Sequence, residues 1–467
     1  MPFVPAHPHP TAPARRIVVV GGTAAGPAAA AKAARVHPNA DVIMLEMGYD
    51  ISYGVCELPY LLSGEVAEAN HLVVHTPESL EREKRVRVLT GHQVTAIHPA
   101  QRRLEVRDLA TKSLRTEPYD RLILATGARA RTLPVFPPSC SNVFTLKSLE
   151  DARRMLACLT TTAPRRATVV GAGYIGIEVA EALASRALEV TVLAASAEPL
   201  PAMDAEARAL LVTLLAERGI RFLPSTTITQ VHTRNDAVHA LRTDDDIIET
   251  DLVVVAVGIE PRSGLAREAG IRIGRDGGIL TDARQMTSID GIHAAGDCTE
   301  VLNLVTGRTQ LMPFASLAAR AGRVAGENAA GGSATFKGTV PLSAVTVFGH
   351  EFAQAGCSVE ECARAGIDVV HASIVGSTRV PFMPDARSLI AGLTAERRAG
   401  RLVGGIVVAA EHAAQRANVV AMAIHQRMTV DAFLEMDFMY TPKLAPLREP
   451  LLVCAERLRG RLNASRR

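Results

Sequence analysis

The residue whose type and position best suit redox chemistry is Cys56, in the stretch ISYGVCELPY at residues 51–60. A thiolate is a nucleophile and a two-electron carrier wherever its surroundings favour the negative charge. Cys56 stands in an irregular segment directly after a nucleotide-binding pattern, whereas a cysteine without such a setting is usually a small core residue. The sequence therefore predicts that Cys56 acts beside a bound nucleotide.

The pattern before Cys56 is a strand, a glycine-rich turn and a helix. Residues 17–26 read IVVVGGTAAG, and the alanine-rich residues 27–35 continue as the helix. The next apolar strand, residues 41–45, ends at Glu46, about 20 residues beyond the turn, where an acid can bind a ribose hydroxyl while the helix N-terminus holds a pyrophosphate. The turn residues predicted to contact this cofactor are Gly21, Gly22, Thr23, Ala24, Ala25 and Gly26.

A second and more complete glycine pattern follows at residues 167–176, ATVVGAGYIG. Gly171, Gly173 and Gly176 stand in G-x-G-x-x-G order between a β-run and a predicted helix at residues 177–185. The following strand, residues 189–193, ends in Ala194, where a fold selective for the unphosphorylated ribose usually has an acid. A second dinucleotide is predicted to bind here, and the pattern does not indicate whether its ribose carries a 2′-phosphate.

Two further strands are predicted to belong to the first nucleotide domain. The strand at residues 119–124 runs into ATGAR, which contains Thr126 and Gly127. A short strand before Gly296 ends at Asp297, an acid suited to a polyol chain such as ribitol. The second glycine pattern and a further apolar strand, residues 251–257 followed by Gly258, come earlier in the sequence than this short strand. The second domain is therefore predicted to be inserted into the first.

The predicted fold class is α/β, with two Rossmann-like dinucleotide-binding domains and a C-terminal α+β domain. We place the first domain at residues 16–130 and 259–335, the inserted domain at 131–258 and the C-terminal domain at 336–467. A helix at residues 313–330 closes the first domain. The C-terminal domain is predicted to hold strands at 340–349 and 401–410, a helix at 415–427 and a proline-punctuated tail. Residues 1–15 are predicted to be a disordered extension.

Composition excludes several classes of partner. The 467 residues carry a formal net charge of +3, which is too balanced to indicate nucleic acid or a membrane surface. No run of about 18 apolar residues predicts a membrane span. Seven cysteines without paired spacing indicate neither a disulfide framework nor a zinc site, and no histidine spacing suggests a metal. A cytoplasmic location is expected.

Taken together, these residues resemble a known family, the flavin-dependent pyridine nucleotide disulfide reductases. The resemblance is closest to the single-cysteine branch, which holds coenzyme A disulfide reductases, NADH oxidases and NADH peroxidases, and it spans residues 17–453. Its carriers are GGTAAG with Glu46, ISYGVCELPY, ATGAR, GAGYIGIEVAE, HAAGDCTEV, ARAGRVAGENAAG and DFMYTP.

The resemblance implies FAD in the first domain, NADH or NADPH in the second and a homodimer whose partner completes each active site. It implies that Cys56 is the redox thiol, that Tyr174 lies over the flavin and that Tyr440 of the partner protonates the leaving sulfur. The FAD residues would be Gly21, Gly26, Glu46, Thr126 and Asp297, the nicotinamide residues Gly171, Gly173, Tyr174, Gly176 and Glu178, and the substrate residues Ser52, Lys32 and Arg35. A thiolate beside a flavin and a helix N-terminus is expected as the resting form.

Some positions depart from the family's patterns. The peroxidases carry a histidine where this chain has Ala24, so peroxide reduction with that histidine as the acid is not expected. Coenzyme A disulfide reductases usually flank the cysteine with Asn and Gly, and this chain has Val55 and Glu57. They also use a further tyrosine near the position of Phe382. A carboxylate beside Cys56 would raise the thiol pKa if it pointed inward.

The predicted function is FAD-dependent reduction of a low-molecular-weight disulfide or persulfide by NADH or NADPH. One alternative is an NADH oxidase in which Cys56 cycles through a sulfenic acid. Another, from a different class, is an electron-transfer flavoprotein reductase or a redox-responsive binding protein, neither of which needs Cys56 for turnover. The sequence leaves open which disulfide is reduced.

Overall fold

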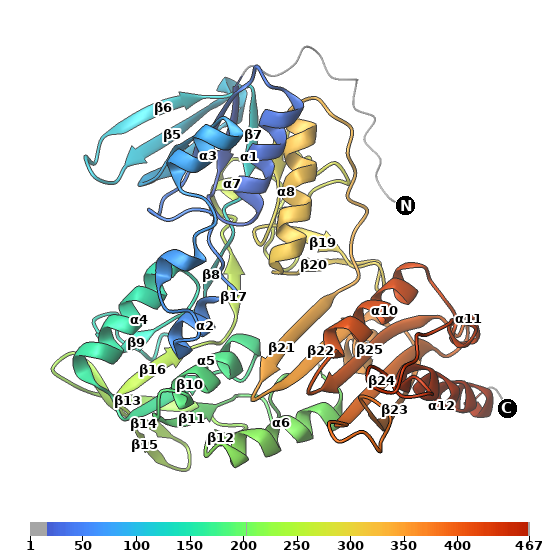
Figure 1. The fold of residues 1–467 in the computed structure, drawn as a ribbon. Coiled ribbons are helices and arrows are strands. Elements are labelled where there is room, and N and C mark those ends of the chain that lie inside the picture. The colour runs from blue at the N-terminus through green and yellow to red at the C-terminus, as the bar shows by residue number, and fades with distance from the viewer. Residues whose placement is uncertain (1–15, 202, 466–467) are drawn as a thin grey trace.

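A computed structural model describes residues 16–201 and 203–465, and the predicted extension at residues 1–15 lies outside this range. Figure 1 shows three lobes: two nucleotide-binding lobes joined by a narrow ribbon, and a C-terminal lobe beside them. The α/β fold class and the inserted arrangement predicted from the sequence are confirmed. No helix in the described ranges is long and apolar enough to cross a membrane.

The first lobe is built on a five-stranded parallel sheet in the order β18-β7-β1-β2-β3. Its central strand is buried on both faces, because helices α1 and α8 cover one side and a three-stranded antiparallel sheet the other. The bounds are β1 Arg16–Val20, α1 Ala25–Val36, β2 Asp41–Leu45, β3 Val86–Leu89, β7 Arg121–Leu124, β18 Ile292–Ala294 and α8 Ala315–Ala329. The second sheet holds β4 His92–His98, β5 Arg103–Asp108 and β6 Leu114–Pro118.

Smaller elements complete the first lobe and bridge it to its neighbours. The helix α2 follows Cys56 and packs on the second lobe, where α2 and α5 share one apolar cluster. These elements are α2 Leu58–Ser63, η1 Ala69–Leu72, α3 Pro77–Lys84, η2 Pro99–Gln101, α7 Gly264–Glu268, β19 Glu300–Leu302 and β20 Thr309–Leu311.

Close backbone contact fixes the first glycine turn. Gly21 has φ 115°, and a Cβ on Gly26 would lie 1.8 Å from the Gly21 carbonyl oxygen, so only glycine fits there. The helices α1 and α8 also pack backbone to backbone, because a Cβ on Gly322 would lie 2.3 Å from the Ala25 carbonyl oxygen. This packing holds the N-terminus of α1 at the carboxyl ends of the strands.

The second lobe repeats the plan with a parallel sheet in the order β12-β11-β10-β16-β9. Its elements are β9 Val143–Phe144, α4 Leu149–Thr162, β10 Arg166–Val170, α5 Tyr174–Ala184, β11 Glu189–Leu193, α6 Ala205–Glu217, β12 Arg221–Leu223 and β16 Leu252–Val255, with a small antiparallel sheet of β13 Ile228–Arg234, β14 Ala237–Thr243 and β15 Ile247–Glu249. The chain enters and leaves this lobe through the antiparallel pair β8 Ala128–Ala130 and β17 Ile259–Pro261.

The C-terminal lobe is an antiparallel sheet in the order β21-β22-β25-β24-β23 with helices packed against it. Its elements are β21 Leu342–Val347, β22 His350–Gly356, α9 Val359–Ala365, β23 Val369–Ser377, β24 Ser388–Glu396, β25 Leu402–Ala409, α10 Ala413–His425, α11 Val430–Leu434 and α12 Pro450–Ser465. The prediction of a proline-punctuated tail was wrong for residues 450–465, which form a helix. Pro450 starts α12, and Leu451 and Leu458 of this helix are fully buried against the sheet.

Candidate functional site

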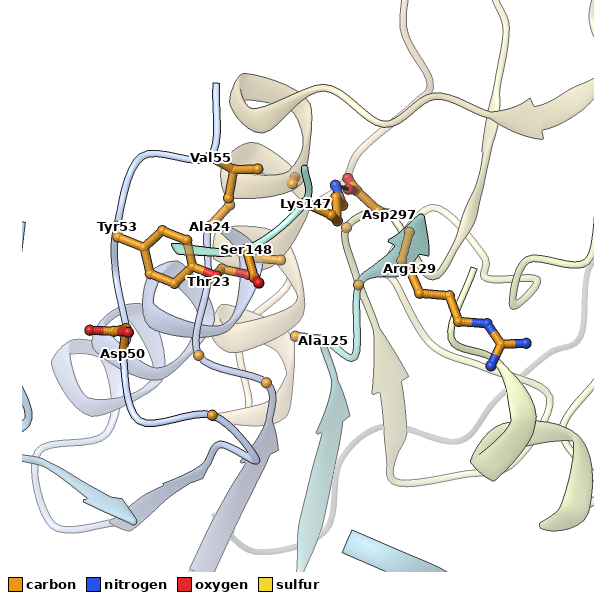
Figure 2. A pocket seen from close by; sticks show the side chains of 18 of the residues that line it. Thr23, Ala24, Asp50, Tyr53, Val55, Ala125, Arg129, Lys147, Ser148 and Asp297 are labelled. Atoms are coloured by element: carbon orange, nitrogen blue, oxygen red, sulfur yellow. Dashed lines mark hydrogen bonds and ion pairs between the residues drawn. The ribbon is translucent and has the colours of Figure 1, made fainter. Parts of the chain in front are cut away.

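A cavity of about 910 Å³ opens at the carboxyl ends of the first lobe's strands. In parallel α/β sheets this is where nucleotides bind. Figure 2 shows its walls, with Thr23 and Ala24 on the glycine turn, Tyr53 and Val55 on the segment before Cys56, and Lys147 facing Asp297. The predicted residues that line it are Gly21, Gly22, Thr23, Ala24, Ala25, Glu46, Cys56, Thr126, Gly127, Gly296 and Asp297.

Glu46 is held at the end of β2 by two backbone amides. Its carboxylate accepts hydrogen bonds from the Gly22 amide at 2.6 Å and the Gly48 amide at 2.7 Å. A carboxylate fixed in this way presents its remaining lone pairs to a ribose hydroxyl. This orientation agrees with the role predicted for Glu46.

The N-terminus of α1 is open toward the cavity. Ala24 is its N-cap residue and makes no side-chain capping hydrogen bond. In the first turn the Gly26 amide donates to the Thr23 carbonyl oxygen at 3.0 Å and Pro27 has no N–H, so what this helix end offers a pyrophosphate is mainly the positive end of its dipole. Gly26 does not line the cavity and instead packs against Gly21. The helix N-terminus, the cavity of about 910 Å³ and two carboxylates suited to ribose and ribitol therefore fit FAD.

Lys147 is a site residue that the sequence analysis missed. Its Nζ lies 3.0 Å from Oδ2 of Asp297, the acid predicted to meet the ribitol. The residue precedes α4, where Ser148 and Asp151 form a capping box that fixes the chain direction. The S-x-x-D pattern of this capping box was the available signal, because it places Lys147 just outside a helix start.

A second missed pair, Arg153 and Asp50, closes the cavity on the side of the Cys56 segment. The Arg153 Nη2 atom donates to Asp50 Oδ1 at 2.9 Å, and both residues line the cavity. Burial raises the pKa of Tyr53 nearby to about 12, so its hydroxyl stays protonated and can donate a hydrogen bond. Neither ion partner lies near the other in sequence, and only the fold brings them together.

Cys56 lies where the large cavity meets a smaller one of about 310 Å³. Cys56 is an exposed residue, but the walls of both cavities lie around its thiol. The partial desolvation that these walls cause is the main factor that raises the pKa of the thiol. The carboxylates of Glu57 and Glu178 raise it further, and the ammonium of Lys147 opposes them. The protein's own residues therefore do not provide the stabilised thiolate that was expected, because the following helix α2 spans only 6 residues and begins beside Glu57.

The smaller cavity lies between α2, α5, β21 and the start of α10, and Glu178 of α5 lines it together with Cys56. Burial, reinforced by Glu181, raises the pKa of Glu178 to about 7. A carboxyl group with such a pKa can exchange protons near neutral pH. The hydroxyl of Tyr60 lies 3.1 Å from the Thr346 hydroxyl and joins α2 to β21 at the rim.

Tyr174 is placed differently from the expectation that it lies over the flavin. Its hydroxyl lies 2.7 Å from the Ser343 hydroxyl on β21, and its side chain lines neither cavity. Burial raises the pKa of Tyr174. The glycines of the second pattern, Gly171, Gly173 and Gly176, form a turn at the carboxyl edge of the second sheet. Gly258 follows the neighbouring strand β16.

The predicted substrate residues do not gather at Cys56. Ser52 has φ 47°, and its amide donates to the Gly22 carbonyl oxygen at 2.7 Å, so it supports the turn. Lys32 is paired with Glu327 of α8 at 2.6 Å, and Arg35 is exposed on the last turn of α1. Tyr440 is half-exposed on the C-terminal lobe and lines neither cavity of its own chain.

The seven cysteines are all free, and the described residues contain no group of His, Cys, Asp or Glu suited to a metal ion. Of these thiols only Cys56 lines either of the two cavities described here. Cys298, next to Asp297, is fully buried and points to the Leu124 and Ala295 carbonyl oxygens. Cys56 is therefore the cysteine placed for chemistry with both a cofactor and a substrate.

The two nucleotide folds and the thiol between them define a class of flavoenzyme. Residues 15–322 match the pyridine nucleotide-disulphide oxidoreductase family, and residues 342–450 match the dimerisation domain of the same family. The chain belongs to this family. It is an oxidoreductase that acts on sulfur groups with FAD and NAD(P)H as cofactors.

Individual relatives cover almost the whole chain. The chain is 29% identical over 443 residues to a protein named NADH oxidase from Methanocaldococcus jannaschii, covering 94% of this chain and 98% of that one. It is 29% identical over 446 residues to the NAD(P)H coenzyme A polysulfide/persulfide reductase of Pyrococcus horikoshii, covering 95% and 98%. A solved NAD-dependent persulfide reductase from A. fulgidus superimposes with a TM-score of 0.93 at 32% identity, covering 96% of this chain and 84% of that one.

Proposed function

We propose that this protein reduces a low-molecular-weight disulfide or persulfide, with Cys56 as its only redox thiol. The observation that carries the proposal is the position of Cys56 at the junction of two cavities, one that fits FAD and one open to a small substrate. Relatives named coenzyme A disulfide reductase and persulfide reductase support the reaction class.

Cys56 begins the reaction by attacking one sulfur of the substrate as a thiolate, which breaks the substrate's S–S bond, releases the other sulfur as the first thiol once it is protonated, and leaves a mixed disulfide on Cys56. The bound flavin supplies the electron pair that it receives from the reduced nicotinamide. Lys147 favours the thiolate form of Cys56, while the neighbouring carboxylates oppose it. The second thiol leaves when the mixed disulfide is reduced, and Cys56 is ready for another cycle.

Proton delivery to the leaving sulfur is proposed to involve two groups. Glu178 lines the same cavity as Cys56, and its pKa of about 7 lets it carry a proton at neutral pH. Tyr440 of the partner subunit would be the second group, reaching the site across the dimer. Its half-exposed position outside its own chain's cavities supports a role in the other subunit.

Dimer formation is proposed to use the C-terminal lobe. Large apolar side chains stand exposed there, and such groups on a family dimerisation domain are expected to be covered by a second copy. The most exposed of them are Val375, Phe382, Met439 and Leu447.

The function is tested by anaerobic turnover of the FAD-loaded enzyme with NADH or NADPH and a panel of disulfides. We expect nicotinamide oxidation to depend on the disulfide, and Cys56→Ser to lower turnover by about a thousandfold. Cys158→Ser, which alters a half-buried thiol on α4 outside both cavities, is the matched control and should keep wild-type turnover.

Two other results would point to the alternatives. If nicotinamide oxidation requires oxygen and ignores every disulfide, the protein is an NADH oxidase. Full activity of Cys56→Ser with an external electron acceptor would instead identify an electron-transfer flavoprotein.

A further inference from the structure

The smaller cavity beside Cys56 is lined by acids and has no basic residue. Its ionisable walls are the carboxylates of Glu57, Glu178 and Glu351, and neither lysine nor arginine lines it. The remaining polar lining consists of hydroxyl and amide groups from Tyr60, Thr346 and Gln415. A substrate that reaches the thiol through this cavity therefore meets negative charge.

Glu57 is the acid closest to the thiol in sequence, and its side chain is folded back along the loop. A Cβ on Gly54 would lie 2.2 Å from Glu57 Oε2, so the carboxylate fills the space that a side chain at Gly54 would occupy. Glu57 lines both cavities and raises the pKa of Cys56. Glu57 therefore lies at the wall that the two cavities share, next to the thiol that the substrate sulfur must reach.

The other two acids differ in how far their charge is compensated. Glu351 accepts hydrogen bonds from the first amides of α10, from Ala413 at 2.7 Å and Ala414 at 3.1 Å, so the helix terminus offsets part of its charge. Glu178 has no lysine or arginine beside it in this cavity, and burial raises its pKa to about 7, so it is only partly ionised at neutral pH. Glu57 is thus the fixed negative charge whose effect on the substrate is simplest to isolate.

The cations that the sequence predicted for an anionic substrate, and the lysine beside Cys56, do not line the smaller cavity. Lys32, predicted to meet a coenzyme A phosphate, forms an ion pair with Glu327 at 2.6 Å. Arg35 is exposed at the far end of α1 and lines neither cavity. Lys147 is paired with Asp297 on the side of the larger cavity.

We propose that the substrate accepted at Cys56 is a small disulfide that carries ammonium groups rather than phosphates or carboxylates. This inference rests on the proposed function and specifies its substrate class. The Cys56 thiolate attacks one sulfur, the S–S bond of the substrate breaks, and one aminothiol leaves with a proton. Two electrons from NAD(P)H then reduce the mixed disulfide, release the second aminothiol and restore the thiolate.

The test uses three disulfides of similar size and different charge. Cystamine carries two ammonium groups, bis(hydroxyethyl) disulfide is neutral, and dithiodipropionate carries two carboxylates. Anaerobic kcat/KM is measured with the full-length, FAD-loaded protein, so any charge that the partner subunit brings to the cavity is included. Coenzyme A disulfide serves as a fourth, phosphorylated substrate.

The preference for a cationic substrate is measured by the ratio of kcat/KM for cystamine to kcat/KM for dithiodipropionate. This ratio is compared between the wild type and Glu57→Gln. Intrinsic disulfide reactivity cancels in this comparison. We expect the ratio to be about tenfold higher in the wild type at low salt and to converge as salt is added. Glu68→Gln, an exposed acid on the same segment that lines neither cavity, should keep the wild-type ratio.

A second measurement needs no turnover. Cationic and anionic methanethiosulfonates should label Cys56 at rates that differ in the same direction, and Glu57→Gln should reduce the difference. An unchanged ratio in Glu57→Gln, or a wild-type preference for dithiodipropionate and coenzyme A disulfide, overturns the inference and leaves the proposed function intact. If no disulfide is reduced by the wild type, the proposed function fails, and this inference fails with it.

Discussion

The two glycine turns of this molecule share a backbone hydrogen-bond pattern, and the strands beside them are followed by different residues. Gly21 donates to the Leu45 carbonyl oxygen at 2.8 Å, and Gly171 donates to the Leu193 carbonyl oxygen at 2.7 Å. The residue after the second strand is Glu46 in the first lobe and Ala194 in the second, and each amide donates to the next strand. The backbone scaffold is therefore common to both, and we expect the residue at the strand end to contribute to nucleotide selection.

The largest effects are expected from breaking the close packing that both turns share. A Cβ would lie 1.8 Å from a backbone oxygen at Gly26 and 1.9 Å at Gly176, so valine at either position must displace the turn. We expect Gly26→Val to yield protein without bound flavin. Gly176→Val should keep the yellow flavin and lose its reduction by NADH and NADPH, which visible spectra and anaerobic titration measure. Loss of flavin from Gly176→Val would show that the turns are not independent.

The next prediction gives the second turn the acid that the first one has. Ala194→Asp places a carboxylate at the counterpart of Glu46, where it can bind ribose hydroxyls and repel a 2′-phosphate. We expect kcat/KM for NADPH to fall about tenfold or more, roughly 1.4 kcal/mol, while NADH keeps its value. Steady-state kinetics with both nicotinamides measures this, and Glu217→Gln on α6 is a distant control. Equal losses for NADH and NADPH would contradict the assignment.

Two residues of the second lobe act on the pKa of Cys56 with opposite sign. Lys147, at the larger cavity, lowers the pKa of the thiol, and Glu178, on the helix of the second turn, raises it. Lys147→Met should therefore slow alkylation of Cys56 by iodoacetamide near pH 8, and Glu178→Gln should speed it, each by about threefold. Rate against pH is the measurement. Shifts of the same sign in both variants would mean that desolvation alone controls the thiol.

How much the sequence could predict follows from where the signals lie. Both glycine turns, Glu46, Asp297 and Cys56 were found because local patterns fix strand, turn and helix within a few residues. The structure brings the first turn, Glu46, Asp297 and Cys56 to one cavity, and the second turn lies in the other lobe. Lys147, Arg153 and Asp50 were missed because their partners lie far away in the sequence. The helix α12 was missed because its proline was interpreted as a breaker, although proline is favoured in the first turn of a helix.

The resting state of Cys56 shows the limit of motif reasoning in another way. A helix start near a cysteine predicts a stabilised thiolate, but α2 is short, and Glu57 is its N-cap residue. Burial and the carboxylates of Glu57, Glu178 and Asp297 therefore outweigh the ammonium group of Lys147 in their effect on the pKa of the thiol. The sign of a charge effect depends on which side chains the fold turns inward, and the spacing of residues does not encode that.

The smallest effect is expected in the pH dependence of the protein's stability, and it arises from Glu178 in the second lobe. Burial raises the pKa of Glu178 to about 7, above its value in the unfolded chain, so the folded state binds this proton more tightly. The contribution is thus fully favourable below the unfolded pKa near 4.5, and it is lost as pH rises through about 7. Glu178→Gln stays neutral and should avoid this loss.

We expect Glu178→Gln to gain about 1 kcal/mol in free energy of unfolding over the wild type between pH 5 and pH 8, after allowance for partial solvent access. Denaturant titrations of the FAD-loaded proteins at the two pH values measure the difference. Glu189→Gln, an exposed acid at the start of β11, should show no such pH dependence. If the wild type and Glu178→Gln change in parallel from pH 5 to pH 8, the carboxyl group of Glu178 is not held in its protonated form by burial.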